Sequence, residues 1–156
     1  MCAPAGDSVR VVVQRVAHAA VEVEGKEVGR IGRGFLVLAG FGKDDNDARI
    51  DWMARKVASL RIFEDESGRM ASGLDAVNGE ILVVSQFTLY GDVKKGARPG
   101  FDGSARPDEA RDMYQRFLAA LRAAFPGRIA TGDFQAHMNV SLTNDGPVTI
   151  LIDNDS

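Results

Sequence analysis

The stretch ILVVSQFTL at residues 81–89 carries the clearest structural signal in this chain. The residues before Ser85 are apolar and largely β-branched, which predicts a strand buried on both faces. This strand is expected to run directly into a turn formed by residues 86–89. Backbone N–H groups at such a strand end have no partner in the sheet. The stretch therefore predicts a buried strand that presents amide donors where it ends.

Further strands are predicted on both sides of this stretch. Residues 10–16 (RVVVQRV) and 35–41 (FLVLAGF) share its apolar, β-branched character. Residues 20–24 and 27–31 flank a glycine and a lysine that signal a hairpin. Additional strands are expected at residues 61–63, 138–143 and 148–152, with a turn between the last two.

Two helices are predicted between these strands. Residues 44–47 supply carboxylates suited to a helix amino terminus, and apolar residues recur at helical spacing after them. In the second helix, Pro107 suits the first helical position and residues 110–121 form one apolar face. Pro126-Gly127 is expected to end this helix. Arg106 stands where a capping serine would be usual, which concerns stability more than chemistry.

This order of elements predicts an α/β fold of mixed, mostly antiparallel curled sheets with helices packed on one side, a β/β/α three-layer arrangement. The chain has 156 residues, which fits a single domain over residues 1–156. Residues 1–8 are expected to form a flexible tail. No internal repeat or low-complexity tract interrupts this pattern.

Composition narrows the functional classes. The net charge of −3 argues against a general nucleic-acid binder, so any RNA contact needs a local basic patch. The single cysteine, Cys2, allows no disulfide within the chain, which favours a cytoplasmic location. No apolar run approaches the ~18 residues of a membrane span, and the first eight residues do not resemble a secretory signal.

Familiar catalytic arrangements are missing from the sequence. His18 and His137 are the only histidines, and no cluster of ligands at metal spacing accompanies them, so no metal or other cofactor is expected. Ser85 follows a strand but lacks the glycine elbow of a serine hydrolase. No glycine-rich phosphate loop precedes a helix. An enzyme of this sequence would work without the usual side-chain nucleophile and base.

Two segments, SQFTL at residues 85–89 and NDGPVT at residues 144–149, resemble the paired signatures of D-aminoacyl-tRNA deacylases. The resemblance runs from about residue 9 to residue 152. The flanking segments VVVQRV, RIF and GDFQAHMNVSLT are also similar and occur in the same order. The resemblance implies a homodimeric hydrolase that cleaves the ester bond of D-aminoacyl-tRNA and releases the free D-amino acid and tRNA.

The resemblance assigns the catalytic turn to Ser85, Gln86, Phe87 and Thr88. Main-chain amides at this turn suit the oxyanion that forms when water attacks an ester, and one such donor is worth ~2.7–4 kcal/mol. Gln86 and Thr88 would orient the substrate, and Phe87 would stack on the terminal adenine for ~1–3 kcal/mol. The family's mechanism adds help from the 2′-hydroxyl of the tRNA. Taken alone, the turn could equally be a hydrophilic strand end, and Thr88 has no visible base to activate it as a nucleophile.

The resemblance also assigns chiral selection to Gly146-Pro147, as a cis dipeptide that reaches into the active site of the partner subunit. Rigid carbonyls aimed at the alpha carbon would reject any L-residue whatever its side chain. Arg15 matches the arginine that holds these carbonyls, although it could also be a surface charge at a strand edge. Glycine has no side chain to reject, so glycyl-tRNA is expected to be cleaved as well.

The remaining expected contacts are a pocket and a basic loop. Pocket residues implied by the resemblance are Phe134, Ala136 and Met138, which could also be core residues. Gln135 departs from the family, which more often has a very small residue there. Residues implied in tRNA binding are Lys94, Lys95 and Arg98. Three alternatives stay open: a non-catalytic tRNA-binding homodimer, an esterase of small molecules, whose rate would not respond to salt, and a purely structural homodimer, which would give no reason for the Gly-Pro step.

Overall fold

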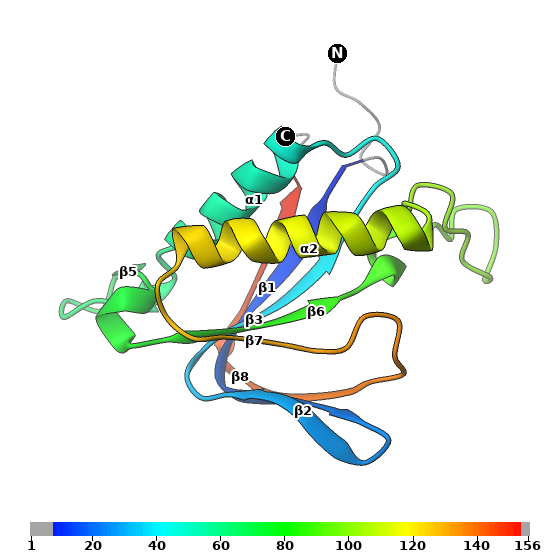
Figure 1. The fold of residues 1–156 in the computed structure, drawn as a ribbon. Coiled ribbons are helices and arrows are strands. Elements are labelled where there is room, and N and C mark those ends of the chain that lie inside the picture. The colour runs from blue at the N-terminus through cyan, green and yellow to red at the C-terminus, as the bar shows by residue number, and fades with distance from the viewer. Residues whose placement is uncertain (1–7, 154–156) are drawn as a thin grey trace.

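The computed structural model describes residues 8–153 and has two α-helices packed against a curled sheet (Figure 1). Cys2 and most of the expected tail lie outside the described residues. The elements follow in the order β1 (Arg10–Val23), β2 (Lys26–Ile31), β3 (Gly34–Gly40), α1 (Asp47–Ser59), β4 (Phe63–Glu64), β5 (Met70–Ser72), η2 (Leu74–Val77), β6 (Glu80–Ser85), η3 (Phe87–Tyr90), α2 (Pro107–Ala124), β7 (Ile129–Thr131) and β8 (Asn139–Asp153).

The long strand β1 organises the sheet. It pairs with β8 along one edge, and with β2 and β3 along the other, in each case antiparallel. Beyond β3, the strands β6 and β7 continue the sheet in parallel. The sheet then curls back on itself, because β2 approaches β7 so closely that a Cβ atom on Gly29 would lie 2.7 Å from the carbonyl oxygen of Thr131. The mixed, mostly antiparallel curled sheet is the predicted fold class.

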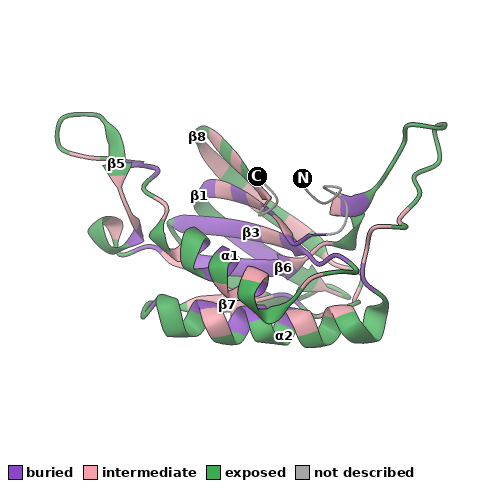
Figure 2. Cartoon of the chain, turned by 90° about the horizontal axis from the view of Figure 1, so that it is seen from above, coloured by how far each residue is buried: buried purple, intermediate pink, exposed green. Residues whose placement is uncertain are grey.

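Two apolar cores result from this curl. The larger one lies between the sheet and the helices and contains Phe35, Phe63 and Phe117. The smaller one fills the concave inside of the sheet and contains Leu36, Leu82 and neighbouring aliphatic residues. Figure 2 shows the strands β3 and β6 buried between these layers, with the outer faces of both helices exposed. The three-layer arrangement with helices on one side is therefore confirmed.

The helix ends agree with the residues found there. The side chain of Asn46 accepts a hydrogen bond from the backbone N–H of Arg49, so α1 begins at a side-chain cap. Pro107 begins α2 as predicted, and Arg106 before it makes no side-chain cap. Helix α2 ends at Ala124, just before the Pro-Gly pair.

Two predicted strand boundaries are wrong. Residues 10–16 and 20–24 form one continuous strand, β1, and residues 138–143 and 148–152 form one strand, β8. The expected turn at residues 144–147 is instead an irregularity within the pairing, between Gln14 and His18 of β1. The side chain of Asn144 stabilises it, since it accepts from the N–H of Val148 at 2.6 Å and donates to the carbonyl of the same residue.

Ser8, the one residue of the expected tail that the structure describes, is fully buried and is not part of a flexible tail. Its hydroxyl donates to the carboxylate of Asp153 at 2.8 Å, which ties the start of β1 to the end of β8. The turn predicted at residues 86–89 is present as η3, a short 3₁₀ helix, whereas the two-stranded hairpin of β4 and β5 was not predicted.

Candidate active site

The strands β3, β6 and β7 run parallel, so their carboxyl ends lie together at one end of the sheet. Ala39 on β3 pairs with Ser85 on β6, and Val83 on β6 pairs with Thr131 on β7. The segments that follow these strands therefore lie next to one another. Open α/β sheets commonly bind ligands at the carboxyl ends of their parallel strands.

The turn after β6 leaves two backbone donors unpaired. The N–H of Gln86 still bonds to the carbonyl of Ala39 at 2.8 Å, which continues the sheet by one residue. The N–H groups of Leu89 and Gly91 bond back within the turn. Among the described residues, no acceptor takes the N–H groups of Phe87 and Thr88, which begin η3. The amide donors predicted from the sequence are therefore present, at the start of a 3₁₀ turn.

Side chains of the turn face solvent or one another. The Gln86 amide Nε2 donates to the Thr88 hydroxyl, so the hydroxyl oxygen is already engaged. Phe87 is 57% exposed, which leaves a ring face open to a ligand. Its ring and that of Phe101 from the following loop form an edge-to-face pair, with centroids 5.0 Å apart at 61°. An exposed phenylalanine beside two free amides is an unusual feature for a simple strand end.

The turn is anchored from beneath by residues that the sequence did not single out. The buried Tyr90 hydroxyl donates to the carbonyls of Ser8 and Gly40. Arg10 donates to the carbonyl of Leu89 at 2.9 Å, and its guanidinium lies 4.9 Å from the centroid of the Tyr90 ring. These contacts fix the turn against β1 and β3. The tyrosine directly after the SQFTL segment was the available signal in the sequence.

The predicted pocket residues lie in the segment after β7. The N–H of Gly132 bonds to the carbonyl of Val83 at 3.0 Å, which brings this segment beside the end of β6. Phe134 packs on Tyr114 with ring centroids 5.7 Å apart. Burial raises the pKa of Tyr114 to about 12, so its hydroxyl stays protonated, and it donates to the same Val83 carbonyl.

The other two pocket residues differ in their surroundings. Ala136 is half-buried, and its N–H closes a turn with the carbonyl of Asp133. Met138 packs into the concave core of the sheet. Gln135 between them has a φ of 65°, in the left-handed region where a small residue is favoured, and its side chain turns outward to accept from Arg111.

Gly146-Pro147 lies in β8, and its peptide bond is cis, as the resemblance implies. Arg15 is 4% exposed, and its Nε donates to the carbonyl of Asp145, the residue before the dipeptide, at 2.8 Å. A Cβ atom on Gly146 would lie 3.0 Å from the Arg15 Nη2. Arg15 is thus a buried residue in contact with this segment and not a surface charge.

Within one chain, the turn follows the carboxyl end of β6, whereas the dipeptide lies midway along β8, level with the amino-terminal end of β6. Ser85 is level with Val11 and Ile152 through the pairing of β6, β3, β1 and β8. The dipeptide lies level with residues 14–16 of β1, which correspond to the start of β6. One chain therefore brings the turn together with the pocket segment, but not with Gly146-Pro147.

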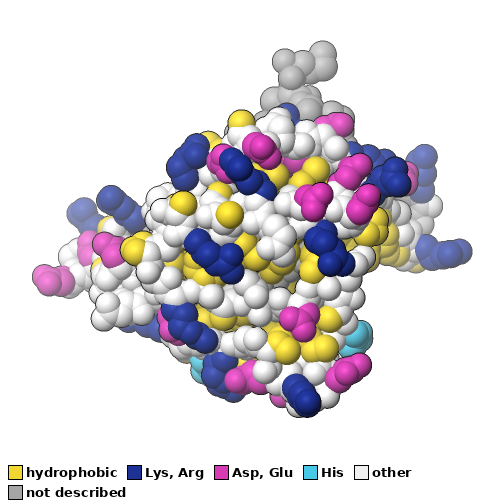
Figure 3. Space-filling view, viewed as in Figure 1, with side chains coloured by type: hydrophobic (Ala, Val, Ile, Leu, Met, Phe, Trp, Pro, Cys, Tyr) yellow, Lys and Arg dark blue, Asp and Glu magenta, His cyan; other side chains and the backbone are white. Residues whose placement is uncertain are grey.

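The three basic residues lie on a loop that projects from the body of the protein. This loop is held by a β-bridge between Asp92 and Gly100, and the Asp92 side chain accepts from the N–H of Lys94 at 2.9 Å. Lys94, Lys95 and Arg98 are all exposed. In Figure 3, Lys and Arg side chains extend from the projection at the right of the molecule, on the side of the η3 turn.

Other candidate chemistry is limited. His18 is exposed, and its Nε2 is 3.0 Å from the Thr143 hydroxyl, away from the turn. Within residues 8–153, no group of three or more His, Cys, Asp or Glu side chains could hold a metal ion. No helix in the same part of the chain is long and apolar enough to cross a membrane.

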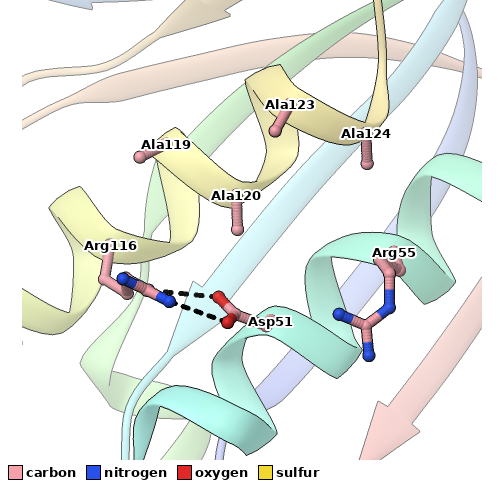
Figure 4. Close-up of a pocket in the computed structure, with 7 residues that line it drawn as sticks. All are labelled: Asp51, Arg55, Arg116, Ala119, Ala120, Ala123 and Ala124. Carbon is pink, nitrogen blue, oxygen red and sulfur yellow. Dashed lines mark hydrogen bonds and ion pairs between the residues drawn. The ribbon is translucent and has the colours of Figure 1, made fainter.

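A groove between α1 and α2 lies on the face of the helices away from the sheet edge. Its floor is made of alanines of α2, and its wall includes the ion pair of Arg116 with Asp51, 2.8 Å apart (Figure 4). It contains none of the residues that the sequence assigned to a site. The Asp51 pKa is lowered, mainly by the hydrogen bond from Arg116.

Comparisons with known proteins agree with this arrangement. Residues 12–153 match the model of the family D-Tyr-tRNA(Tyr) deacylase. The D-aminoacyl-tRNA deacylase of Symbiobacterium thermophilum is 54% identical over 146 residues, 94% of this chain and 96% of that protein. The protein of the same name from Thermotoga petrophila is 55% identical over 144 residues, 92% of this chain and 96% of that one.

Solved structures have the same fold. A structure titled c-Myc DNA Unwinding Element Binding Protein has a TM-score of 0.87 at 42% identity, and the match covers 92% of this chain and 97% of that chain. A probable eukaryotic D-amino acid tRNA deacylase has a TM-score of 0.81 at 22% identity, covering 93% and 98%. With the family match spanning nearly the whole chain, this protein belongs to the D-Tyr-tRNA(Tyr) deacylase family.

Proposed function

We propose that this chain hydrolyses the ester bond between a D-amino acid and the 3′ end of tRNA, in the cytoplasm. The observation that carries the proposal is the pair of unpaired amides of Phe87 and Thr88 beside an exposed phenylalanine ring. The family membership supports it, since close relatives are named D-aminoacyl-tRNA deacylases.

In the proposed reaction, water attacks the ester carbonyl and the resulting oxyanion accepts hydrogen bonds from the two amides. These donors are already oriented, because the Tyr90 and Arg10 contacts hold the turn. The 2′-hydroxyl of the terminal ribose assists the attacking water. Collapse of the intermediate breaks the bond to the ribose oxygen and releases the free D-amino acid and tRNA. No side chain is assigned as a nucleophile, since the Thr88 hydroxyl is paired with the neutral Gln86 amide and not with a base that could activate it.

Recognition of the terminal adenine is assigned to Phe87. Its open face suits stacking on a base, which is worth ~1–3 kcal/mol. The amino acid would extend toward the pocket segment, where Phe134 and Ala136 lie beside the end of β6. The N–H donors of the turn would then hold the ester carbonyl, and the apolar pocket segment would hold the amino-acid side chain.

Chiral selection is assigned to the main-chain carbonyls of Gly146-Pro147, which would clash with the side chain of an L-residue. Since the dipeptide in its own chain is level with the amino-terminal end of β6, and the turn follows the carboxyl end of β6, the dipeptide at this turn would come from a second copy. The edge strand β8 is suited to such an interface, because its outward face includes Leu151, which is 77% exposed. The active unit is accordingly a homodimer. Glycyl-tRNA is also a substrate, because glycine has no side chain to reject.

The projecting basic loop is assigned to the tRNA backbone. Lys94, Lys95 and Arg98 carry three positive charges on a protein with a net charge of −3. Contacts to phosphates make binding depend on salt, with a slope of about 0.7 to 0.9 per neutralised phosphate. Replacing all three residues by alanine should flatten the slope of log KM against log salt by about two.

The test is hydrolysis of D-tyrosyl-tRNA and L-tyrosyl-tRNA at equal concentrations. Rapid release of D-tyrosine with L-tyrosyl-tRNA left intact supports the proposal. Equal rates for both would refute the chiral assignment. A purified protein that sediments as a monomer at working concentrations would refute the assignment of the dipeptide to a partner.

Nucleic-acid binding without hydrolysis is the second candidate. It is favoured by one observation, that a structure 42% identical to this chain is titled as a DNA unwinding element binding protein. Tight binding of tRNA, or of an unpaired DNA strand, without release of D-tyrosine would support it over the deacylase.

A further inference from the structure

Arg15 is held in one orientation by contacts on several sides of its guanidinium. Its Nε donates to the Asp145 carbonyl at 2.8 Å, and its Nη1 donates to the carbonyl of Ile62 at 2.8 Å. Beneath it lies the ring of Phe63, 5.9 Å from the guanidinium carbon. The remaining nitrogen, Nη2, faces Gly146. The guanidinium is therefore a rigid support behind the dipeptide segment.

The carboxylate of Glu64 completes this support. Both of its oxygens lie 3.1 Å from the Arg15 Nη1, so the two side chains share a charge-assisted contact. The hydrogen bond from Arg15 is the main reason that the pKa of Glu64 is lowered. Glu64 therefore remains charged at neutral pH and keeps its hold on the arginine.

The backbone that carries Glu64 is itself well fixed. Phe63 stacks on Phe35 in the main core, with ring centroids 5.5 Å apart and nearly parallel planes. The Asp65 carboxylate accepts from the N–H groups of Ser67 and Arg69, which closes the turn after β4. Glu64 thus stands between a packed core and a tight turn, and its position relative to β8 varies little.

We propose that Glu64 is a positioning residue for chiral selection, which acts by holding Arg15 against the Gly146-Pro147 segment. The inference rests on the proposed function, and it extends that function to a residue that does not touch the substrate. Without the Glu64 carboxylate, Arg15 keeps its two carbonyl acceptors and the Asp145 carboxylate, 3.7 Å from its Nε, but Nη1 loses its charged partner. The dipeptide carbonyls then gain freedom to move away from an L-side chain.

A role limited to stability accounts poorly for this contact. The Glu64 side chain is 48% exposed, and the buried Arg15 still has the Asp145 carboxylate 3.7 Å from its Nε, so loss of Glu64 does not leave a buried charge without a partner. The buried carbonyl contacts and the Phe63 ring already provide the packing of Arg15. The Glu64 carboxylate therefore acts mainly by orienting the Arg15 guanidinium.

The test compares Glu64→Gln with Glu66→Gln in the intact protein. Glu66 is an exposed carboxylate two residues further along the same turn, so both variants lose one charge at nearly the same place. For each variant, kcat/KM is measured with D-tyrosyl-tRNA and with L-tyrosyl-tRNA, and the thermal midpoint is recorded. The ratio of the two rate constants reports selectivity independently of the amount of folded protein.

Glu64→Gln should raise hydrolysis of L-tyrosyl-tRNA by about fivefold while D-tyrosyl-tRNA changes by less than about twofold, as expected for a weakened charge-assisted contact. Glu66→Gln should leave both rates unchanged. If Glu64→Gln has the wild-type ratio, or lowers both rates equally, the positioning role is refuted. A wild-type protein that does not hydrolyse D-tyrosyl-tRNA refutes the proposed function instead, before any variant is compared.

Discussion

Gly40→Ala provides a direct test of the main-chain oxyanion site, because it moves the turn without changing any residue in it. Gly40 is the last residue of β3 and is buried beneath the turn. A Cβ atom there would lie 2.9 Å from the Gln86 carbonyl oxygen and 2.9 Å from the Tyr90 ring. Both neighbours are held firmly, so neither can swing away as a flexible side chain would.

The size of the effect follows from these distances. Ordinary contact begins at 3.4 Å, so the Gln86 carbonyl must retreat by about 0.5 Å and carry the Phe87 and Thr88 amides with it. Misplacement on this scale should lower kcat by about 10-fold to 100-fold, less than the complete loss of one oxyanion donor. The added methyl group should also destabilise the fold by about 1–3 kcal/mol, or about 3–10 °C in Tm.

The assay is single-turnover hydrolysis of D-tyrosyl-tRNA well below the thermal midpoint, with tRNA binding measured separately. Gly32→Ala is the matched control, because its Cβ would meet only the Glu80 side chain at an ordinary 3.7 Å. The control should have wild-type rates. A folded Gly40→Ala protein with wild-type kcat would show that the amides of this turn do not stabilise the oxyanion.

Three further substitutions test separate parts of the reasoning. Thr88→Ala should retain kcat within about tenfold in steady-state assays, because the main chain carries the chemistry; abolished turnover with intact substrate affinity would refute that mechanism. Phe87→Ala should weaken binding of an adenosine-ended tRNA by about 1–3 kcal/mol in equilibrium titrations, and unchanged affinity would remove the stacking role. Asp51→Asn should lower the free energy of unfolding at pH 7 by about 0.5 kcal/mol, since the Asp51–Arg116 pair joins the two helices and is partly exposed. The folded-state pKa of Asp51 is depressed, so this contribution is present above its ordinary value of 3.8 and is lost as the pH falls through the lower folded-state pKa. If the wild-type protein and Asp51→Asn still differ in the free energy of unfolding below that folded-state pKa, this assignment of the ion pair is contradicted.

Local patterns predicted the buried strand β6, both helices and the fold class. These features depend on periodicity and on residues such as Pro107, whose preferences act within a few positions of the chain. The unpaired amides of Phe87 and Thr88 were also predictable, since a strand that ends in a turn leaves donors behind. Family resemblance added the cis Gly146-Pro147 step, for which the local sequence alone suggested an ordinary turn.

Long-range pairing decided what local patterns could not. The breaks that suggested separate strands within β1 and β8 disappear, because each strand is the partner of the other over most of its length. The bulges that keep this pairing continuous depend on residues more than 100 positions apart. The free energy of folding gained from a local turn is smaller than that gained from the backbone hydrogen bonds of such a long strand pair.

By itself, the sequence determined both helices, the buried strand β6, the fold class and the chemical character of the turn at the end of β6, since each depends on neighbouring residues. The tertiary structure alone decided that Arg15 is buried against Glu64 and the Asp145 carbonyl, and that Gly146-Pro147 is level with the end of β6 opposite to that turn. These relations join segments that are about 50 to 130 residues apart, and only the packed sheet brings them together or keeps them apart.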